Sequence, residues 1–249
     1  MVRMAGRSFL SAYVLLGVLN VISLVTGNTD GAALTKPLLM PLLACWLIVE
    51  ARRIWTPPLR WLFAALVFAW FGDLLLMGAS DLAFALGIGA FLVTQILLVA
   101  AFTSVRGIRF RRSIIQFSAE PARGLVEQKR LLLLAFAAYY VVFLTILWPT
   151  SGALRIPVAV YGIAILAMAA SALNLVGRVP SKAAWVTFTG AGLFVISDSL
   201  IALEAFGPLE ASSLHSALVM LTYVAAQGLI AVGLVTGVRD VEAVRATAA

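Results

Sequence analysis

Eight apolar runs, separated by breaks rich in turn-forming residues, dominate this sequence, and of these breaks only the one at about residues 103–130 is expected to be a long loop. They cover residues 8–26, 34–49, 60–78, 82–102, 131–148, 155–176, 184–205 and 214–236. Each run is close to the ~20 residues that a helix needs to cross the hydrocarbon core of a bilayer. Only 12% of the residues are charged, well below the roughly 25% of an ordinary soluble domain. The runs therefore predict an all-α membrane bundle of about eight transmembrane helices, with residues 1–249 forming a single transmembrane domain.

The positive charges gather in alternate breaks between the runs. If the N-terminus is cytoplasmic, all but two of the 18 lysines and arginines fall on the inner side, and only Lys36 and Arg155 fall outside. The inner set is Arg3, Arg7, Arg52, Arg53, Arg60, Arg106, Arg109, Arg111, Arg112, Arg123, Lys129, Arg130, Arg178, Lys182, Arg239 and Arg245. Because cytoplasmic loops carry the excess of lysine and arginine, we expect a multi-pass protein of the bacterial inner membrane with both termini in the cytoplasm. The net charge of +7 then orients the chain and contacts anionic membrane lipids, and we expect no nucleic-acid partner.

The sequence contains few residues that could bind a metal or form a disulfide. Cys45 is the single cysteine and lies in an apolar run, and His215 is the single histidine. One cysteine cannot form an internal disulfide, and a metal site made of several cysteines or several histidines is excluded. We therefore expect neither a metal nor a cofactor.

The two halves of the chain show a weak similarity. The third and seventh runs each contain one aspartate, Asp73 and Asp198, and the fourth and eighth each contain one glutamine, Gln95 and Gln227. Runs that are four apart cross the membrane in the same direction. The pattern is therefore that of a 4+4 parallel repeat.

Asp73 and Asp198 are the candidate catalytic residues. Asp73 lies about five residues before the outer end of its run and Asp198 about seven. At ~1.5 Å per residue, both lie roughly 7–11 Å below that end. Ionisable side chains at such depth are costly, usually face the bundle interior and generally mark function. The plainer alternative is a pair of structural aspartates that hydrogen-bond to serine or tyrosine neighbours.

Four other side chains reach the same depth and are candidate substrate-binding residues, namely Lys36, Tyr161, Ser197 and Tyr223. Lys36 begins the second run, and its simplest interpretation is an interfacial lysine whose ammonium group extends to the lipid headgroups. The alternatives are a counter-ion for an aspartate or a contact for a lipid phosphate. Tyr161 and Tyr223 lie deeper than the usual belt of interfacial aromatic residues, and Ser197 directly precedes one aspartate.

Gln95 and Gln227 complete the candidate substrate-binding set. Gly87, Phe91 and Gln95 share one helical face at i, i+4 and i+8, and Tyr223 and Gln227 are spaced at i and i+4. The favoured interpretation of the two glutamines is structural, because a buried amide can hydrogen-bond across two closely packed transmembrane helices.

Six segments follow a common pattern in a fixed order along the chain. They are Thr35-Lys36-Pro37-Leu38, Trp70-Phe71-Gly72-Asp73-Leu74-Leu75-Leu76-Met77, Gly87-Ile88-Gly89-Ala90-Phe91-Leu92, Pro157-Val158-Ala159-Val160-Tyr161-Gly162, Gly190-Ala191-Gly192-Leu193-Phe194-Val195-Ile196-Ser197-Asp198-Ser199 and Thr222-Tyr223-Val224-Ala225-Ala226-Gln227. Together they resemble the YhhN family of lysoplasmalogenases, over most of the chain and six of the eight runs. The sequence differs from the family's pattern at Gln95, where many members are expected to have a histidine, and at Leu98, where a tyrosine is expected.

The resemblance implies an activity and a catalytic pair. It implies hydrolysis of the vinyl-ether bond of lysoplasmalogen, a lysophospholipid, to a fatty aldehyde and a glycerophospho-alcohol. It also implies that Asp73 and Asp198 are the catalytic residues. Such hydrolysis requires a proton on carbon and attack by water on an oxocarbenium ion, as in glycoside hydrolysis by one carboxylic acid and one carboxylate.

The neighbours of the two aspartates suggest how they divide these roles. The residues one helical turn from Asp73 are apolar, so we expect Asp73 to be the acid. Ser197 and Ser199 flank Asp198, so we expect Asp198 to be the solvated anion. Lys36 is expected to hold the phosphate of the substrate.

Two other classes of protein use intramembrane aspartates. A proton-coupled transporter is the main alternative, because paired acids also form proton relays. The sequence has no clear pair of broken helices, although the glycine pairs at 87 and 89 and at 190 and 192 keep this alternative open. An intramembrane aspartyl protease is the weaker alternative. Gly72-Asp73 only faintly resembles its motif, Trp70 replaces the upstream glycine and no proline-centred motif follows.

Overall fold

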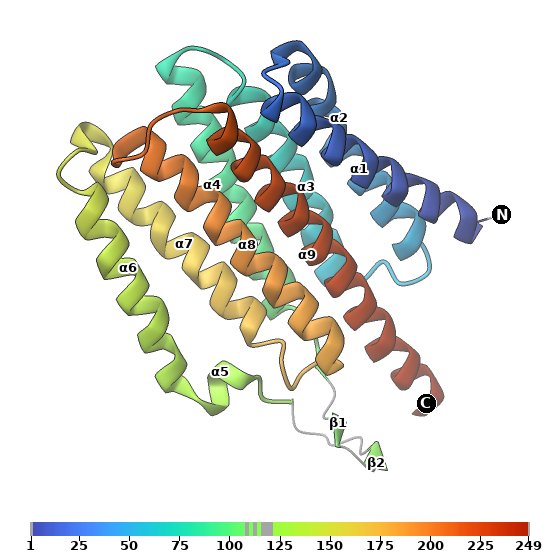
Figure 1. Cartoon of the computed structure of the whole chain (residues 1–249). Helices are drawn as coiled ribbons and strands as arrows, with labels where there is room; N and C mark the ends of the chain where they lie inside the picture. The colour runs from blue at the N-terminus through green and yellow to red at the C-terminus, as the bar shows by residue number, and fades with distance from the viewer. Residues whose placement is uncertain (1, 108–109, 112–113, 116–121, 249) are drawn as a thin grey trace.

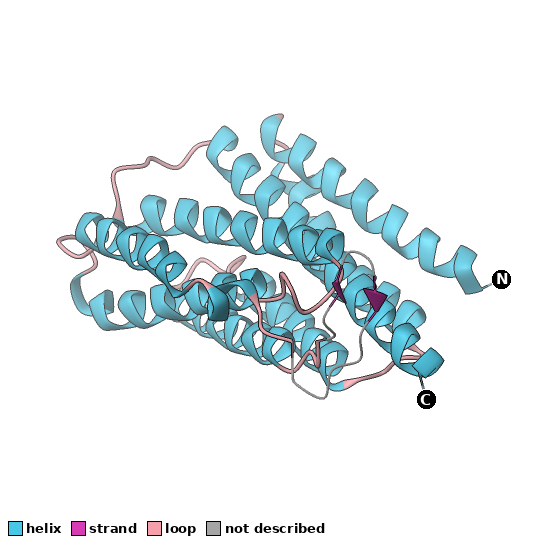
Figure 2. Ribbon diagram, turned by 90° about the horizontal axis from the view of Figure 1, so that it is seen from below, coloured by secondary structure: helices cyan, strands magenta, loops and turns pink. Residues whose placement is uncertain are grey.

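A computed structural model of the chain describes residues 2–107, 110–111, 114–115 and 122–248, and its elements are almost all helices. Figure 1 labels them along the chain, and Figure 2 shows how little of the described chain lies outside helices. In chain order they are α1 (Val2–Val25), α2 (Thr29–Ala51), α3 (Pro57–Leu75), α4 (Asp81–Thr103), β1 (Phe110–Arg111), β2 (Ile114–Ile115), α5 (Leu125–Gln128), the 3-10 turn η1 (Arg130–Leu132), α6 (Leu133–Leu147), the 3-10 turn η2 (Gly152–Leu154), α7 (Arg155–Leu173), α8 (Ser181–Phe206) and α9 (Ser213–Ala248).

Eight helices in the described part of the chain are long and apolar enough to cross a membrane, which confirms the predicted multi-pass helical bundle. Many of their large apolar side chains point outward, among them Ile22, Leu34, Leu131 and Ile156. In water these exposed side chains would favour aggregation, whereas lipid accepts them and requires only that the backbone be hydrogen-bonded internally, as it is in helices. Helix α6 is the extreme case, because Leu147 is its single buried residue, and it lies at the edge of the bundle (Figure 1).

Close helix pairs build the bundle. Helix α1 packs along α2, α3 along α4, and α8 along α9. Glycine permits the closest approach, because a Cβ atom on Gly190 of α8 would lie 2.8 Å from the carbonyl oxygen of Ala226 on α9. Small residues at such crossings let two membrane helices gain packing contacts that bulkier side chains would prevent. The chain termini lie at one end of the bundle (Figure 1), and we call the opposite end the distal end.

Helix α2 begins earlier than the apolar run that predicted it. The side chain of Asn28 accepts a hydrogen bond from the amide of Gly31 at 2.9 Å and caps the helix, which then starts at Thr29. A capping side chain satisfies a backbone amide that has no partner within the helix. Lys36 therefore lies about two turns inside α2 and not at its start, which corrects the expected position.

Helix α9 extends beyond residue 236, where the last apolar run was expected to end, and continues to Ala248. Val238 and Val241 stay buried on this extension. Arg239 forms an ion pair with Glu50 of α2 at 2.5 Å. The apolar run predicts only the part of the helix that crosses the membrane. The rest of α9 is stabilised by packing and by the ion pair.

The segment between α4 and α6, expected to be one long loop, contains the β1–β2 pair and α5. Asn174, at the end of α7, holds α5 in place, because its amide nitrogen donates to a carboxylate oxygen of Glu127 at 2.7 Å. Of the arginines assigned to this segment, Arg109 and Arg112 lie outside the described residues.

Candidate active site

The two candidate catalytic aspartates lie on different helix pairs and differ in burial. Asp73, near the end of α3, is buried with 2% of its surface exposed. Asp198, in the second half of α8, is only partly buried. Both lie in the distal half of the bundle, as the positions in their helices require.

Asp73 is held by a cation and a phenol. The ammonium nitrogen of Lys36 lies 3.8 Å from its Oδ1 atom, and the hydroxyl of Tyr223 donates a hydrogen bond to its Oδ2 atom at 2.8 Å. The Lys36 side chain is 21% exposed. Of the interpretations offered by the sequence, the structure supports the counter-ion, because the longer α2 places Lys36 beside Asp73.

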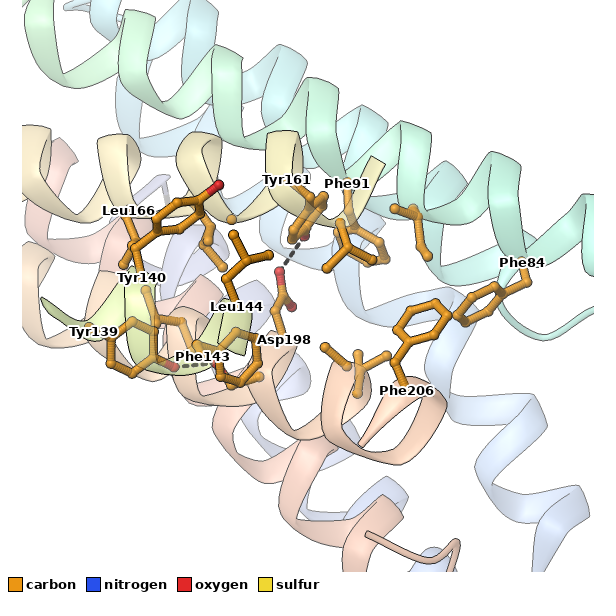
Figure 3. A pocket seen from close by; sticks show the side chains of 18 of the residues that line it. Phe84, Phe91, Tyr139, Tyr140, Phe143, Leu144, Tyr161, Leu166, Asp198 and Phe206 are labelled. Carbon is orange, nitrogen blue, oxygen red and sulfur yellow. Dashed lines mark hydrogen bonds between the residues drawn. The ribbon is translucent and has the colours of Figure 1, made fainter. Parts of the chain in front are cut away.

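Asp198 has two neutral partners. The hydroxyl of Tyr161 on α7 donates to its Oδ2 atom, as the dashed line in Figure 3 marks. The side-chain amide of Gln95 on α4 donates to the same oxygen over a longer distance of 3.4 Å. Gln95 therefore contacts a candidate catalytic residue, in addition to its position between packed helices.

The partners of the two aspartates follow a crossed pattern. Each aspartate has one partner from the preceding span of its own half, Lys36 of α2 for Asp73 and Tyr161 of α7 for Asp198. The other partner belongs to the last span of the opposite half, Tyr223 of α9 for Asp73 and Gln95 of α4 for Asp198. The parallel repeat stays a prediction, but the two halves contribute to the site in the same way.

An aromatic cluster formed by Phe91, Phe194 and Tyr223 joins the two carboxyl sites. Their rings meet edge to face, with centroids 5.7 to 6.4 Å apart. Phe91 fits against α3 because residue 72 is glycine, where a Cβ atom would lie 2.7 Å from the Phe91 ring. Edge-to-face packing is a favourable geometry for aromatic rings, so this cluster helps to hold Tyr223 against Asp73.

Asp198 lines a cavity of about 80 Å³, which we call the apolar pocket. Helices α4, α6, α7 and α8 form its walls, and most of its lining is apolar or aromatic. In Figure 3 the carboxyl group of Asp198 points toward Tyr161, with Phe84 and Phe206 to one side and Tyr139 and Phe143 to the other. A carboxyl group is thus placed against a surface suited to a hydrocarbon chain.

A second cavity opens at the distal end and has a volume of about 640 Å³. This distal cavity lies among α1, α2, α8 and α9, and its polar lining residues are Asn20, Lys36, Glu204 and Ser216. Leu76, Phe84 and Ile201 line both cavities, so the apolar pocket and the distal cavity adjoin. Asp198 faces the first, and Asp73 lies behind Lys36 of the second.

Two of the expected substrate-binding residues, Ser197 and Gln227, form no hydrogen bond to either aspartate among the described residues. The Ser197 hydroxyl donates to the carbonyl of Val219 at 3.1 Å. Ser199, expected to solvate Asp198, instead bonds to the carbonyl of Val195 and to the hydroxyl of Tyr139. Adjacent residues on a helix point in different directions, and for this reason the expected solvation of Asp198 by its two serine neighbours is wrong. Gln227 is 1% exposed, and its side-chain nitrogen has no hydrogen-bond partner among the described residues.

One side-chain contact at the site was missed from the sequence. The His215 side chain, 8% exposed, places Nε2 2.9 Å from a carboxylate oxygen of Glu204. Glu204 is an acidic residue close to the end of an apolar run, a signal that could have found it. Within the described residues, no three His, Cys, Asp or Glu side chains gather as a metal site would require.

Comparisons with known proteins relate the chain to one family. The sequence profile of the YhhN family matches residues 31–234. Two proteins named lysoplasmalogenase, from Mycobacterium bovis and Mycobacterium tuberculosis, are each 35% identical to this chain over 150 residues. The match covers 59% of this chain and 50% of each relative, so the chain spans about half the length of the curated relatives it matches. No solved structure matches the chain significantly.

Proposed function

The chain belongs to the YhhN family, and from this premise we propose that it is a membrane-embedded hydrolase that cleaves the vinyl-ether bond of a lysoplasmalogen. The products are a fatty aldehyde and a glycerophospho-alcohol. One observation carries the proposal: the carboxyl group of Asp198 lines the apolar pocket, and that of Asp73 lies 3.8 Å from the ammonium group of Lys36, which lines the adjoining distal cavity. Acid-catalysed hydrolysis of a lipid ether needs these two environments.

The cavities fit the two ends of a lysophospholipid. The apolar pocket takes the first part of the alkenyl chain. Its volume of about 80 Å³ is well below the roughly 300–1,000 Å³ of pockets that enclose a drug-sized ligand, so the rest of the chain continues into the bilayer. The distal cavity takes the glycerophosphate and its headgroup. The vinyl ether, which joins chain and glycerol, then lies where the two cavities adjoin.

We assign the acid to Asp198 and the carboxylate to Asp73, the reverse of the roles expected from the sequence. Lys36 stabilises an ionised carboxylate on Asp73, since opposite charges attract strongly in a medium of low dielectric constant. The ion pairs of the described residues include none to Asp198, and its surroundings are apolar. A carboxylic acid in such surroundings keeps its proton more readily, and this division of labour between two carboxyl groups is common in hydrolases.

The reaction proceeds with balanced proton transfers. Asp198 gives its proton to the chain-side carbon of the double bond, and an oxocarbenium ion forms at the carbon bonded to oxygen. Water attacks that carbon while Asp73 takes the proton of the water, which yields a hemiacetal. As the carbon–oxygen bond to glycerol breaks, Asp73 returns its proton to the leaving oxygen and Asp198 takes the hydroxyl proton. The aldehyde forms, and both carboxyl groups regain their starting states.

Release of aldehyde tests the function directly. Purified protein in lipid nanodiscs should release a fatty aldehyde from 1-alkenyl-glycerophosphoethanolamine. It should leave the 1-alkyl analogue intact, because a saturated ether cannot be protonated on carbon in this way. Aldehyde formation by wild-type protein but not by Asp198→Asn supports the proposal. Turnover that survives in that variant, or no aldehyde from the wild type, contradicts it.

We also place both chain termini in the cytoplasm and the distal cavity on the outer side of the membrane. In a Cys45→Ser background, cysteines at Asp81 or Pro208 should react with an impermeant thiol reagent added to intact cells. A cysteine at Gln128, near the opposite end of the bundle, should react only after the cells are opened. The opposite labelling pattern would reverse the orientation.

A further inference from the structure

The distal cavity contains one cationic and one anionic side chain. Lys36 and Glu204 both line it, Lys36 from α2 and Glu204 from the end of α8. A zwitterionic lysophospholipid headgroup likewise contains one anion, the phosphate, and one cation, the ammonium. The charges of the cavity therefore complement a zwitterionic headgroup better than an anionic one.

Glu204 is held in place and still accessible. His215 lies 2.9 Å from one of its carboxylate oxygens and is itself almost fully buried, whereas the Glu204 side chain is 35% exposed. This close contact with a buried side chain restricts where the carboxylate can lie. One face of the carboxylate is thus fixed by the protein and another faces the cavity.

Asn20 supplies a second acceptor at the same cavity. Its amide nitrogen donates to the carbonyl of Ala32 at 2.9 Å and to the hydroxyl of Thr35 at 2.8 Å, which fixes the amide plane. Its oxygen has no hydrogen-bond partner in the described part of the chain, although the residue is 1% exposed and lines the cavity. A buried acceptor without a partner is costly, and a hydroxyl or ammonium group of a ligand would satisfy it.

We propose that Glu204 is the residue of the distal cavity that determines headgroup specificity, by binding the cationic amine of a lysophospholipid. The inference rests on the proposed function for its substrate class. Lys36 contacts the phosphate with those of its three N–H donors that do not face Asp73. Glu204, positioned by His215, binds the ammonium group of the headgroup, and Asn20 accepts a hydrogen bond from the glycerol or the amine.

Binding of non-hydrolysable lipids tests the proposal without any turnover. The probes are 1-alkyl-glycerophosphoethanolamine and 1-alkyl-glycerophosphate, which share chain and phosphate and differ in the amine. Their Kd values for the purified full-length protein are measured by native mass spectrometry in detergent. Wild-type protein should bind the ethanolamine probe more tightly. Glu204→Gln should weaken that binding about tenfold, the lower end of the effect of losing a hydrogen bond to a charged group, and leave the phosphate probe unchanged.

Two further variants make the test decisive. Glu204→Lys should invert the preference, because the phosphate probe gains a cation and the ethanolamine probe meets a like charge. Glu210→Gln is the matched control, since Glu210 is an exposed carboxylate at the same end that does not line the cavity, and it should change neither Kd.

The outcomes separate this inference from the proposed function. The amine site is wrong if Glu204→Gln weakens the binding of both probes equally, if it changes neither Kd, or if the wild type shows no preference between the probes. Each of these outcomes overturns the amine site even if the protein releases aldehyde. A wild-type preference that Glu204→Gln abolishes supports the amine site even if no aldehyde is released, and in that case the hydrolase proposal alone fails.

Discussion

The surroundings of Asp73 and Asp198 differ although the two side chains are the same chemical group at similar depths. Asp73 is buried behind Lys36 and receives a hydrogen bond from Tyr223. Asp198 faces an apolar pocket and receives hydrogen bonds from two neutral groups, Tyr161 and Gln95. The cation favours a charged carboxylate at one site, and the apolar walls favour a neutral acid at the other. A pair of like groups can thus perform opposite steps, and removing each partner in turn tests this division.

Loss of either carboxyl group should have the largest effect. Asp73→Asn and Asp198→Asn should each lower kcat by about 10²–10⁴-fold, the usual contribution of a general acid or base. The measurement is aldehyde release by purified variants whose thermal unfolding matches the wild type. The double variant should be little worse than either single variant, because groups that act as a unit are not additive. Turnover close to wild type in either single variant would remove that residue from the mechanism.

Azide separates the roles of the two aspartates. Azide attacks an oxocarbenium ion without needing a base, so it should restore substrate consumption in Asp73→Ala and yield an azido ether. It should not help Asp198→Ala, which cannot form the ion. If azide restored substrate consumption in Asp198→Ala and not in Asp73→Ala, the roles of the two aspartates would be reversed.

Removal of Lys36 should have the next largest effect. Lys36→Met should lower kcat about 10–100-fold, as expected for loss of an interaction with a charged group, and should move the acidic limb of the pH–rate profile to higher pH. Lys36→Arg keeps the cation and should retain more activity. Lys182→Met, at the opposite end of the bundle, is the control. An unchanged profile in Lys36→Met would mean that the lysine does not act on Asp73.

The two tyrosines should differ in a smaller but diagnostic way. Tyr223→Phe removes a hydrogen bond to an ionised carboxylate and should cost about 10–100-fold in kcat. Tyr161→Phe removes one from a neutral acid and should cost only about 2–10-fold. Steady-state kinetics of both variants give the order, with unfolding temperatures as the control for structural damage. A larger loss in Tyr161→Phe would indicate that Asp198 is the ionised member of the pair.

Gln95 should give the smallest change. Its hydrogen bond to Asp198 is long at 3.4 Å, and bonds of this length are weak. Gln95→Leu should therefore lower kcat only about 2–5-fold, near the low end for a neutral hydrogen bond. Gln95→His, which introduces the residue expected in many family members, keeps an N–H donor and should remain near wild type. If the histidine variant is the less active of the two, donation to Asp198 is not the role of residue 95.

The sequence predicted the aspartates better than their surroundings. Depth in a membrane follows from position along a helix, so both acids could be placed from the apolar runs alone. The partners depend on which helices pack together. Lys36 reaches Asp73 because Asn28 starts α2 early, and Gln95 reaches Asp198 across 103 residues of sequence. Ser197 and Ser199, adjacent to Asp198 in the chain, form their hydrogen bonds elsewhere because neighbouring helical residues diverge.

Sequence by itself determined the membrane class, the eight helices and the presence of two acids in the distal half, since hydrophobic length and helical rise are local properties of a segment. The tertiary structure decided which acid has a cation, which faces the apolar pocket, and that Glu204 meets His215 at the distal cavity. These features result from contacts between helices distant in the chain. Lipid matches any apolar helix surface equally well, so packing between the helices, and not their hydrophobicity, selects which faces meet.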